Sequence, residues 1–68
     1  MKLSARNKIP ARVTDINFGE ATANVVMDAS GTRLVASITV EAARELELTE
    51  GSAVTVVVKA SDLILATD

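Results

Sequence analysis

The chain has 68 residues, enough for one small domain, and a single domain is predicted over residues 1–68. It contains no Cys and no His, which excludes metal sites built from thiolate or imidazole ligands. Its net charge of −2 and isoelectric point of about 4.9 argue against broad electrostatic capture of nucleic acid.

The first predicted strand covers residues 7–17, and its apolar residues change phase along the chain. They occupy odd positions first and even positions later: Ile9, Ala11, Val13, then Ile16 and Phe18. Such a change predicts a β-bulge or a strong bend. Pro10 is predicted to lie at an edge or a bulge, because proline has no N–H to donate to a neighbouring strand.

Two alternating strands follow, and tight turns are predicted around them. A turn around Gly19 leads into the strand at 20–29, and Ser30-Gly31 is typical of a hairpin turn before the strand at 33–40. In each strand, every second residue is apolar on one face, which is the pattern of a half-buried strand.

A helix is predicted next, over residues 41–48, because this stretch is rich in helix-forming residues. Thr39 can cap its start, and the residues expected to face the core are Val40, Ala43, Leu46 and Leu48. A β-branched strand is predicted at 53–59, and a short strand at 63–66 closes the chain.

This order of elements predicts an all-β fold: a small five-stranded OB-like barrel with one short helix between strands 3 and 4. Hydrophobic residues make up 49% of the chain, and the mean hydropathy is +0.32. A monomer of this size can hide little apolar surface, so a homo-oligomer is predicted. The outward-facing apolar residues Val26, Val35 and Val57 are the predicted subunit contacts.

No secretory signal is expected, because polar residues follow Met1-Lys2-Leu3 where an apolar segment would be needed. No apolar run approaches the length of a transmembrane helix. With the lack of Cys, these features predict a cytoplasmic location and no membrane partner.

Short clusters of cationic and hydroxyl side chains stand near both ends of the chain. Ser4-Ala5-Arg6 precedes the first strand, and Lys59-Ala60-Ser61 lies at the end of the fourth. Together they offer a guanidinium fork, an ammonium group and hydroxyls, which suit an oxyanion better than a metal cation. Thr39 adds a hydroxyl at the predicted helix start. Taken alone, each group is more typical of a solvated terminus, a turn or a helix cap.

Catalytic motifs are missing, since the chain has no nucleophile elbow and no glycine-rich phosphate loop. A nucleic-acid-binding OB module usually presents stacking aromatics, whereas Phe18 is the only aromatic residue here and is predicted to lie in the core. A binding protein without enzymatic activity is therefore predicted. A nucleic-acid-binding OB module and a structural oligomerisation domain remain as alternatives.

Several segments together resemble the molbindins, also called Mop, a family of small molybdate- and tungstate-binding proteins. These segments read MKLSARN at the start, GTRLVASITV in the third strand, ELELTEG ending at Gly51, and VKASD after the fourth strand. The resemblance covers the whole chain in register. It implies an OB-like fold, a homo-hexamer arranged as a trimer of dimers, and molybdate sites at subunit interfaces.

The implied function is binding of molybdate, or tungstate, for intracellular storage, buffering and homeostasis of molybdenum. The resemblance implies no catalytic cofactor, no bound metal cation and no nucleic-acid partner. Binding of a molybdenum–pterin is an alternative that the same resemblance carries.

By position, the resemblance implies a set of molybdate-binding residues: Ser4, Ala5, Arg6, Thr39, Lys59, Ala60 and Ser61. Thr39 is implied to come from a neighbouring subunit. Many relatives have Ser where this chain has Ala60, so only a backbone N–H remains there. A second class of anion site, lined largely by backbone, is assigned to Glu20, Ala21 and Thr22.

Overall fold

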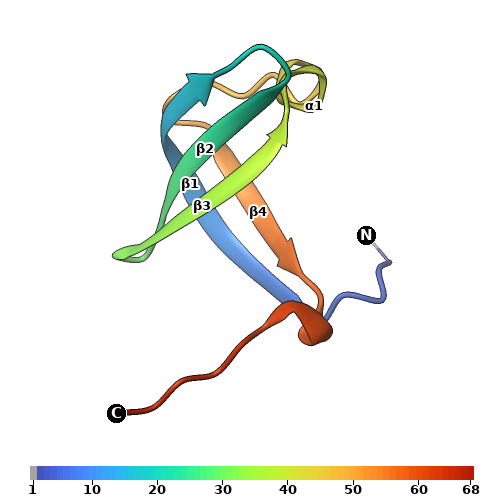
Figure 1. Ribbon diagram of the computed structural model, residues 1–68, viewed down its shortest axis with the longest axis vertical. Helices are drawn as coiled ribbons and strands as arrows, with labels where there is room; N and C mark the ends of the chain where they lie inside the picture. The colour runs from blue at the N-terminus through green and yellow to red at the C-terminus, as the bar shows by residue number, and fades with distance from the viewer. Residues whose placement is uncertain (1) are drawn as a thin grey trace.

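The computed structural model describes residues 2–68 as one antiparallel sheet with a short helix (Figure 1). The sheet order is β3-β2-β1-β4. Along the chain the elements are β1 (Asn7–Phe18), β2 (Thr22–Ala29), β3 (Thr32–Thr39), α1 (Val40–Glu45), β4 (Ala53–Val58) and the 3₁₀ turn η1 (Ala60–Asp62). The all-β prediction with a helix between the third and fourth strands is confirmed.

The prediction of a fifth strand and a closed barrel is wrong for the single chain. Residues 63–66 are not a strand; they follow η1 as exposed chain that leads away from the sheet (Figure 1). Asp62 N–H donates to the Lys59 carbonyl at 2.9 Å, which closes η1 and turns the chain out of line with β4. Within residues 2–68, β3 and β4 are therefore the two edges of an open sheet.

The predicted bulge in β1 is confirmed. The pairing of β1 with β2 shifts register between Val13 and Asp15. Thr14, between them, donates its hydroxyl to the Val26 carbonyl at 3.2 Å. The extra residue lets Val13 and Ile16 both face the core.

Pro10 lies in a part of β1 that pairs with β4 alone, because the ladder with β2 begins at Arg12. Val13 N–H donates to the Ser52 carbonyl at 2.9 Å, so odd residues of β1 bond towards β4. The nitrogen of Pro10 faces the opposite side, beyond the end of β2. Its missing N–H thus leaves no neighbour unpaired, as predicted for an edge position.

The turn between β2 and β3 has two residues with positive φ, Ser30 at 51° and Gly31 at 94°. This is the geometry of a type I′ hairpin turn, which matches the twist of the flanking strands. The predicted hairpin is confirmed.

The helix is shorter than predicted, ending at Glu45, because Glu47 takes a φ of 53° and reverses the chain. Leu46 consequently points outward with 66% of its surface exposed, so its predicted core position is wrong. Leu48 packs on the core. Phe18, also predicted in the core, is 56% exposed at the end of β1.

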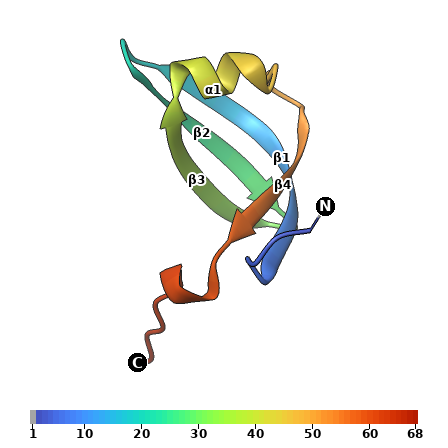
Figure 2. The same cartoon turned by 90° about the vertical axis from the view of Figure 1, so that its right-hand side faces the viewer.

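The core lies on the inner face of the curved sheet, one end of which α1 covers (Figure 2). Val13, Val25 and Met27 are buried against one another, and Ala43 of α1 is buried at the covered end. On the outer face Val35 and Val57 are exposed, as expected from their parity.

The chain exposes more surface than a compact monomer of its size. Its accessible surface is 5407 Å², against about 4100 Å² for a compact chain of this mass. Its radius of gyration is 12.8 Å, where about 11 Å is typical. Among residues 2–68, none lies in a helix long and apolar enough to span a membrane.

Candidate functional site

The pairing of β1 with β4 brings the two cationic clusters of the sequence to the same end of the sheet. Asn7, the first residue of β1, is the cross-strand partner of Val58, the last residue of β4. Continued by one residue, this antiparallel register sets Arg6 opposite Lys59. Segments more than fifty residues apart in sequence therefore lie at the same end of the sheet, here called the Arg6–Lys59 end (Figure 1).

Asn7 holds this end together, and the sequence had not indicated such a role for it. Its side-chain Nδ2 donates to the Val58 carbonyl at 3.2 Å. The bond fixes the backbone immediately before Lys59 against the backbone immediately after Arg6. In the sequence, only the position of Asn7 beside Arg6 associates it with this end of the sheet.

The N-terminal segment is anchored at Ala5, which is 8% exposed. Its neighbours Ser4 and Arg6 are both exposed. A small buried side chain between two exposed ones fixes the backbone while leaving the hydroxyl and the guanidinium accessible. Ala5 therefore contributes by position and through its backbone, since its methyl group offers no donor.

The other half of the Arg6–Lys59 end is η1. Lys59 is its N-cap residue, with an extended backbone (φ −68°, ψ 142°) and no side-chain capping bond. The first N–H groups of a helical turn have no acceptor inside the turn, so those of Ala60 and Ser61 can serve a ligand. Lys59 and Ser61 are exposed and add an ammonium group and a hydroxyl.

Thr39 lies at the opposite end of the sheet, beside Thr22, its partner on β2. Its Oγ1 accepts the Ala42 N–H at 3.0 Å, so the predicted helix cap is confirmed. The hydroxyl proton is still available to donate. A single chain does not bring Thr39 to Arg6, so only Thr39 of another copy can meet the Arg6–Lys59 end.

The residues assigned to a second class of anion site lie in the turn between β1 and β2, next to Thr39. The Thr22 carbonyl accepts from Gly19 N–H at 2.8 Å, and the Ala21 carbonyl from Val40 N–H at 2.9 Å. Glu20 is exposed and adds negative charge to this turn. The structure brings the three residues together, away from the Arg6–Lys59 end.

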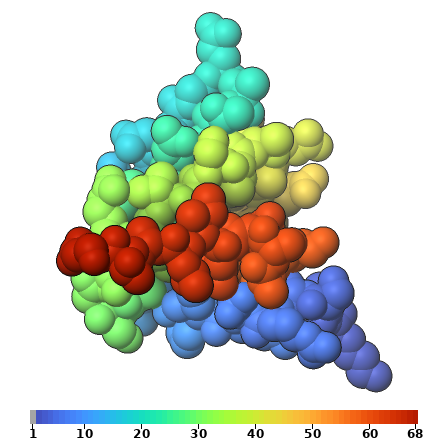
Figure 3. Space-filling model, turned by 60° about the horizontal axis from the view of Figure 1, so that its bottom comes forward, coloured from blue at the N-terminus to red at the C-terminus, as the bar shows by residue number. Residues whose placement is uncertain are grey.

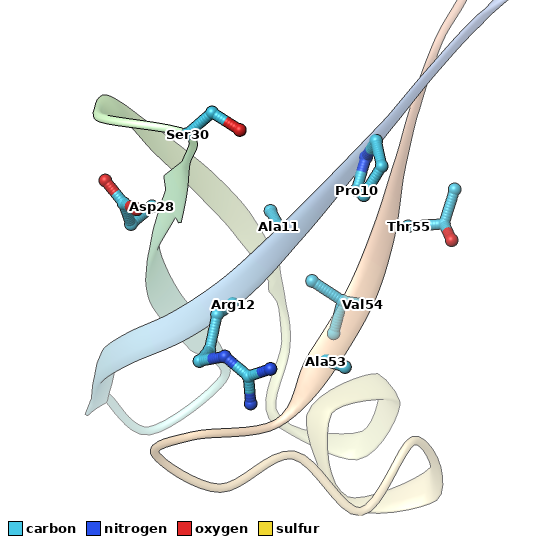
Figure 4. A pocket seen from close by; sticks show the side chains of 8 residues that line it. All are labelled: Pro10, Ala11, Arg12, Asp28, Ser30, Ala53, Val54 and Thr55. Atoms are coloured by element: carbon cyan, nitrogen blue, oxygen red, sulfur yellow. The ribbon is translucent and has the colours of Figure 1, made fainter.

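A shallow hollow on β1 and β4 contains another cation, Arg12, that the sequence reasoning had not proposed as a ligand (Figure 4). Its Nη1 donates to the Gly51 carbonyl at 2.7 Å. Asp28, the cross-strand partner of Arg12, lines the same hollow with a carboxylate. An anion there would meet one engaged guanidinium and one like charge, so the hollow is poorly suited to a dianion.

The comparisons with known proteins agree on one family. The TOBE domain family matches residues 3–65. Molybdenum-pterin-binding protein 2 of Clostridium pasteurianum is 35% identical over 96% of this chain and 97% of its own length. The molybdenum transport protein ModE of Herbaspirillum seropedicae is 36% identical to this chain over a matched region that covers 100% of this chain and 26% of ModE.

Solved structures show the same fold. A molybdate binding protein from Sporomusa ovata is 43% identical, with a TM-score of 0.95 over 98% of this chain and 100% of its own. MopII from Clostridium pasteurianum is 31% identical, with a TM-score of 0.90 over 97% of this chain and 100% of its own. The chain therefore belongs to the TOBE domain family and, within it, to the small molbindins, as the resemblance predicted.

Proposed function

We propose that this protein binds molybdate, or the similar tungstate, at the Arg6–Lys59 end and stores or buffers it inside the cell. The observation that carries the proposal is the β1–β4 register, which pairs Asn7 with Val58 and so brings the backbone at Arg6 and the backbone at Lys59 to the same end of the sheet. Two adjacent cations repel each other, and a dianion between them removes that repulsion. The domain, residues 1–68, acts as a binding unit and not as an enzyme.

The donors at this end suit a tetrahedral dianion. Such an ion is strongly hydrated, and it leaves water only where several donors replace the hydration shell. Arg6 and Lys59 supply charge, while the Ser4 and Ser61 hydroxyls and the N–H groups near Ala5 and Ala60 supply directed hydrogen bonds. A cavity sized for molybdate would give the smaller sulfate poorer contacts, which is how selectivity arises.

The site is completed in a homo-oligomer, for which we propose a hexamer built as a trimer of dimers. Thr39 of a neighbouring subunit supplies the remaining hydroxyl, because it lies far from Arg6 within one chain. The exposed Val35 and Val57 are the proposed contacts, and assembly completes the OB-like barrel that one chain leaves open. The turn at 20–22 is the proposed second anion site.

A molybdenum–pterin is the second candidate ligand, favoured by the names of the Clostridium pasteurianum relatives. A pterin ring needs a flat apolar or aromatic surface, which the small donors of the Arg6–Lys59 end do not provide. The simple oxyanion is therefore the better fit to this site.

Isothermal titration calorimetry with molybdate, tungstate, sulfate and phosphate at matched ionic strength tests the proposal. We expect saturable binding of molybdate and tungstate and at least tenfold weaker binding of sulfate and phosphate. Equal heats for all four anions would indicate general anion screening. Binding of an oligonucleotide with steep salt dependence, and none of molybdate, would favour the nucleic-acid-binding module instead.

A further inference from the structure

Asn7 is polar at a position where the pattern of β1 predicts an apolar residue. Along the first half of β1 the odd residues are the less exposed ones, and this row reads Asn7, Ile9, Ala11 and Val13. Asn7 is itself half-buried. Burial of a side-chain amide lowers stability unless the amide is hydrogen-bonded. The reason for an asparagine at this position is therefore to be found in the bond that it makes.

That bond ties the two halves of the Arg6–Lys59 end to each other. Asn7 Nδ2 donates to the Val58 carbonyl at 3.2 Å, between residues 51 positions apart in sequence. Within residues 2–68 no other side-chain hydrogen bond joins the start of β1 to the end of β4. In the space-filling view the N-terminal segment, in blue, and the segment around η1, in orange-red, lie against each other at this end (Figure 3).

The ladder between β1 and β4 ends at the pair that Asn7 forms with Val58. Backbone hydrogen bonds join alternate pairs of an antiparallel ladder. Val13 N–H donates to β4, so the odd residues of β1 belong to the bonded pairs. The next position outward, Arg6 opposite Lys59, is of the kind without backbone bonds. The Asn7 side chain therefore strengthens the last bonded pair before the two cations.

η1 depends on this last pair for its place beside β1. The hydrogen bonds of η1, such as that from Asp62 N–H to the Lys59 carbonyl at 2.9 Å, stay within the turn. Lys59 makes no side-chain capping bond. The chain enters η1 directly after Val58, so the carbonyl that Asn7 holds is the nearest fixed point of the sheet.

We propose that Asn7 is a positioning residue of the anion site. It holds η1 against the start of β1 in the anion-free protein, so the donors of both segments are in place before the anion binds. The inference rests on the proposed function and deepens it. A pre-formed site binds more tightly, because the apparent affinity falls with the fraction of molecules in which the site is formed. The amide acts through the backbone at Val58 and does not itself contact the anion.

Asn7→Leu tests this role, since leucine has nearly the shape of asparagine but no donor. On the inner face leucine continues the apolar row, so the thermal midpoint should equal or exceed that of the wild type. The affinity for molybdate, measured by calorimetry, should nevertheless fall roughly two- to twelvefold, the range for one net hydrogen bond. A residue that serves only the stability of the fold would lower the midpoint and leave the affinity unchanged, and that result would overturn the proposal.

Asn24→Leu is the matched control, because it makes the same substitution at an exposed position of the central strand β2. It should leave the affinity for molybdate at the wild-type value. An equal loss of affinity in Asn24→Leu and Asn7→Leu would show a general effect of the substitution and would contradict a special role for Asn7.

Amide hydrogen exchange, followed by NMR without any anion, separates positioning from direct contact. Asn7→Leu should speed exchange of the Val58 amide about twofold or more, while the Val25 amide in the core is unaffected. Ser61→Ala, which removes a proposed ligand hydroxyl, should lower the affinity without changing exchange at Val58. If Asn7→Leu likewise loses affinity with unchanged exchange at Val58, Asn7 is a direct ligand and the positioning role is wrong.

The two proposals can fail separately. A wild type that binds no molybdate in the calorimeter overturns the proposed function, while exchange at Val58 still decides whether Asn7 orders this end of the sheet. Normal molybdate binding by the wild type, with the same exchange at Val58 in wild type and Asn7→Leu, overturns only the positioning role.

Discussion

Arg6 and Lys8 are a matched pair of exposed cations on either side of Asn7, but only Arg6 lies at the end where β1 meets η1. Lys8 sits one step inside the ladder, opposite Val57. Arg6→Ala should weaken molybdate binding by roughly 2–5 kcal/mol, the range for a charge pair desolvated at an interface. Lys8→Ala should cost under about 1 kcal/mol, as for an exposed charge.

Lys59→Ala should behave like Arg6→Ala, because both cations would face the same anion. Calorimetric titration of the three variants with molybdate measures these differences. If Arg6→Ala and Lys8→Ala bind molybdate with the same affinity, the site has been assigned to the wrong residues even though the fold stands.

At the scale of the elements, Thr39 links β3 to α1 and has two separable roles. Its oxygen caps the helix, and its proton is proposed to reach an anion held by another subunit. Thr39→Asp keeps a good cap, so the thermal midpoint should stay near that of the wild type. The carboxylate would repel a dianion, so molybdate affinity should fall at least tenfold.

Ser37→Asp is the control, since it adds the same charge on the exposed face of β3 two residues earlier. It should leave the affinity nearly unchanged. Thr39→Ala should instead lower stability by about 1 kcal/mol through loss of the cap. Unaltered molybdate binding by Thr39→Asp would remove Thr39 from the proposed site.

The elements also show how far the sequence alone can lead. Alternation predicted β2, β3 and β4 because the inner face of each strand is less exposed than its outer face. The parity change in β1 predicted its bulge for the same reason. Local patterns failed where the outcome depends on a single backbone angle: the reversal at Glu47 ended the helix early and exposed Leu46.

The fifth strand was mispredicted for a different reason. The apolar run at 63–66 has the composition of a strand, but a strand also needs a neighbouring edge to pair with, and η1 turns this segment away from the sheet of its own chain. The candidate site shows a similar limit. Sequence chemistry identified Arg6 and Lys59 separately, whereas their juxtaposition follows from the register of β1 with β4, which no local pattern contains.

For the whole molecule, we expect light scattering to give about six times the chain mass, as closed symmetry and the resemblance imply. A monomer at micromolar concentration would contradict this assembly.

Molybdate should raise the thermal midpoint, because a ligand that binds only the assembled state stabilises it by about 2.7 kcal/mol at a hundredfold excess over Kd. Sulfate at the same ionic strength is the control, and an equal rise with sulfate would point to non-specific ion effects.

Pro10 affects where a strand of another molecule can pair with the sheet. Residues 7–11 of β1 pair with β4 but extend beyond the ladder with β2. The side of β1 that faces away from β4 is therefore unpaired there and could pair with a strand of another molecule. At Pro10 this edge has no N–H to offer, and the exposed Lys8 beside it carries a charge that opposes aggregation. A foreign strand is thus discouraged here, whereas neither of the edge strands β3 and β4 contains a proline or a lysine. Edge-to-edge pairing with another chain is therefore more favourable along β3 and β4 than along the start of β1.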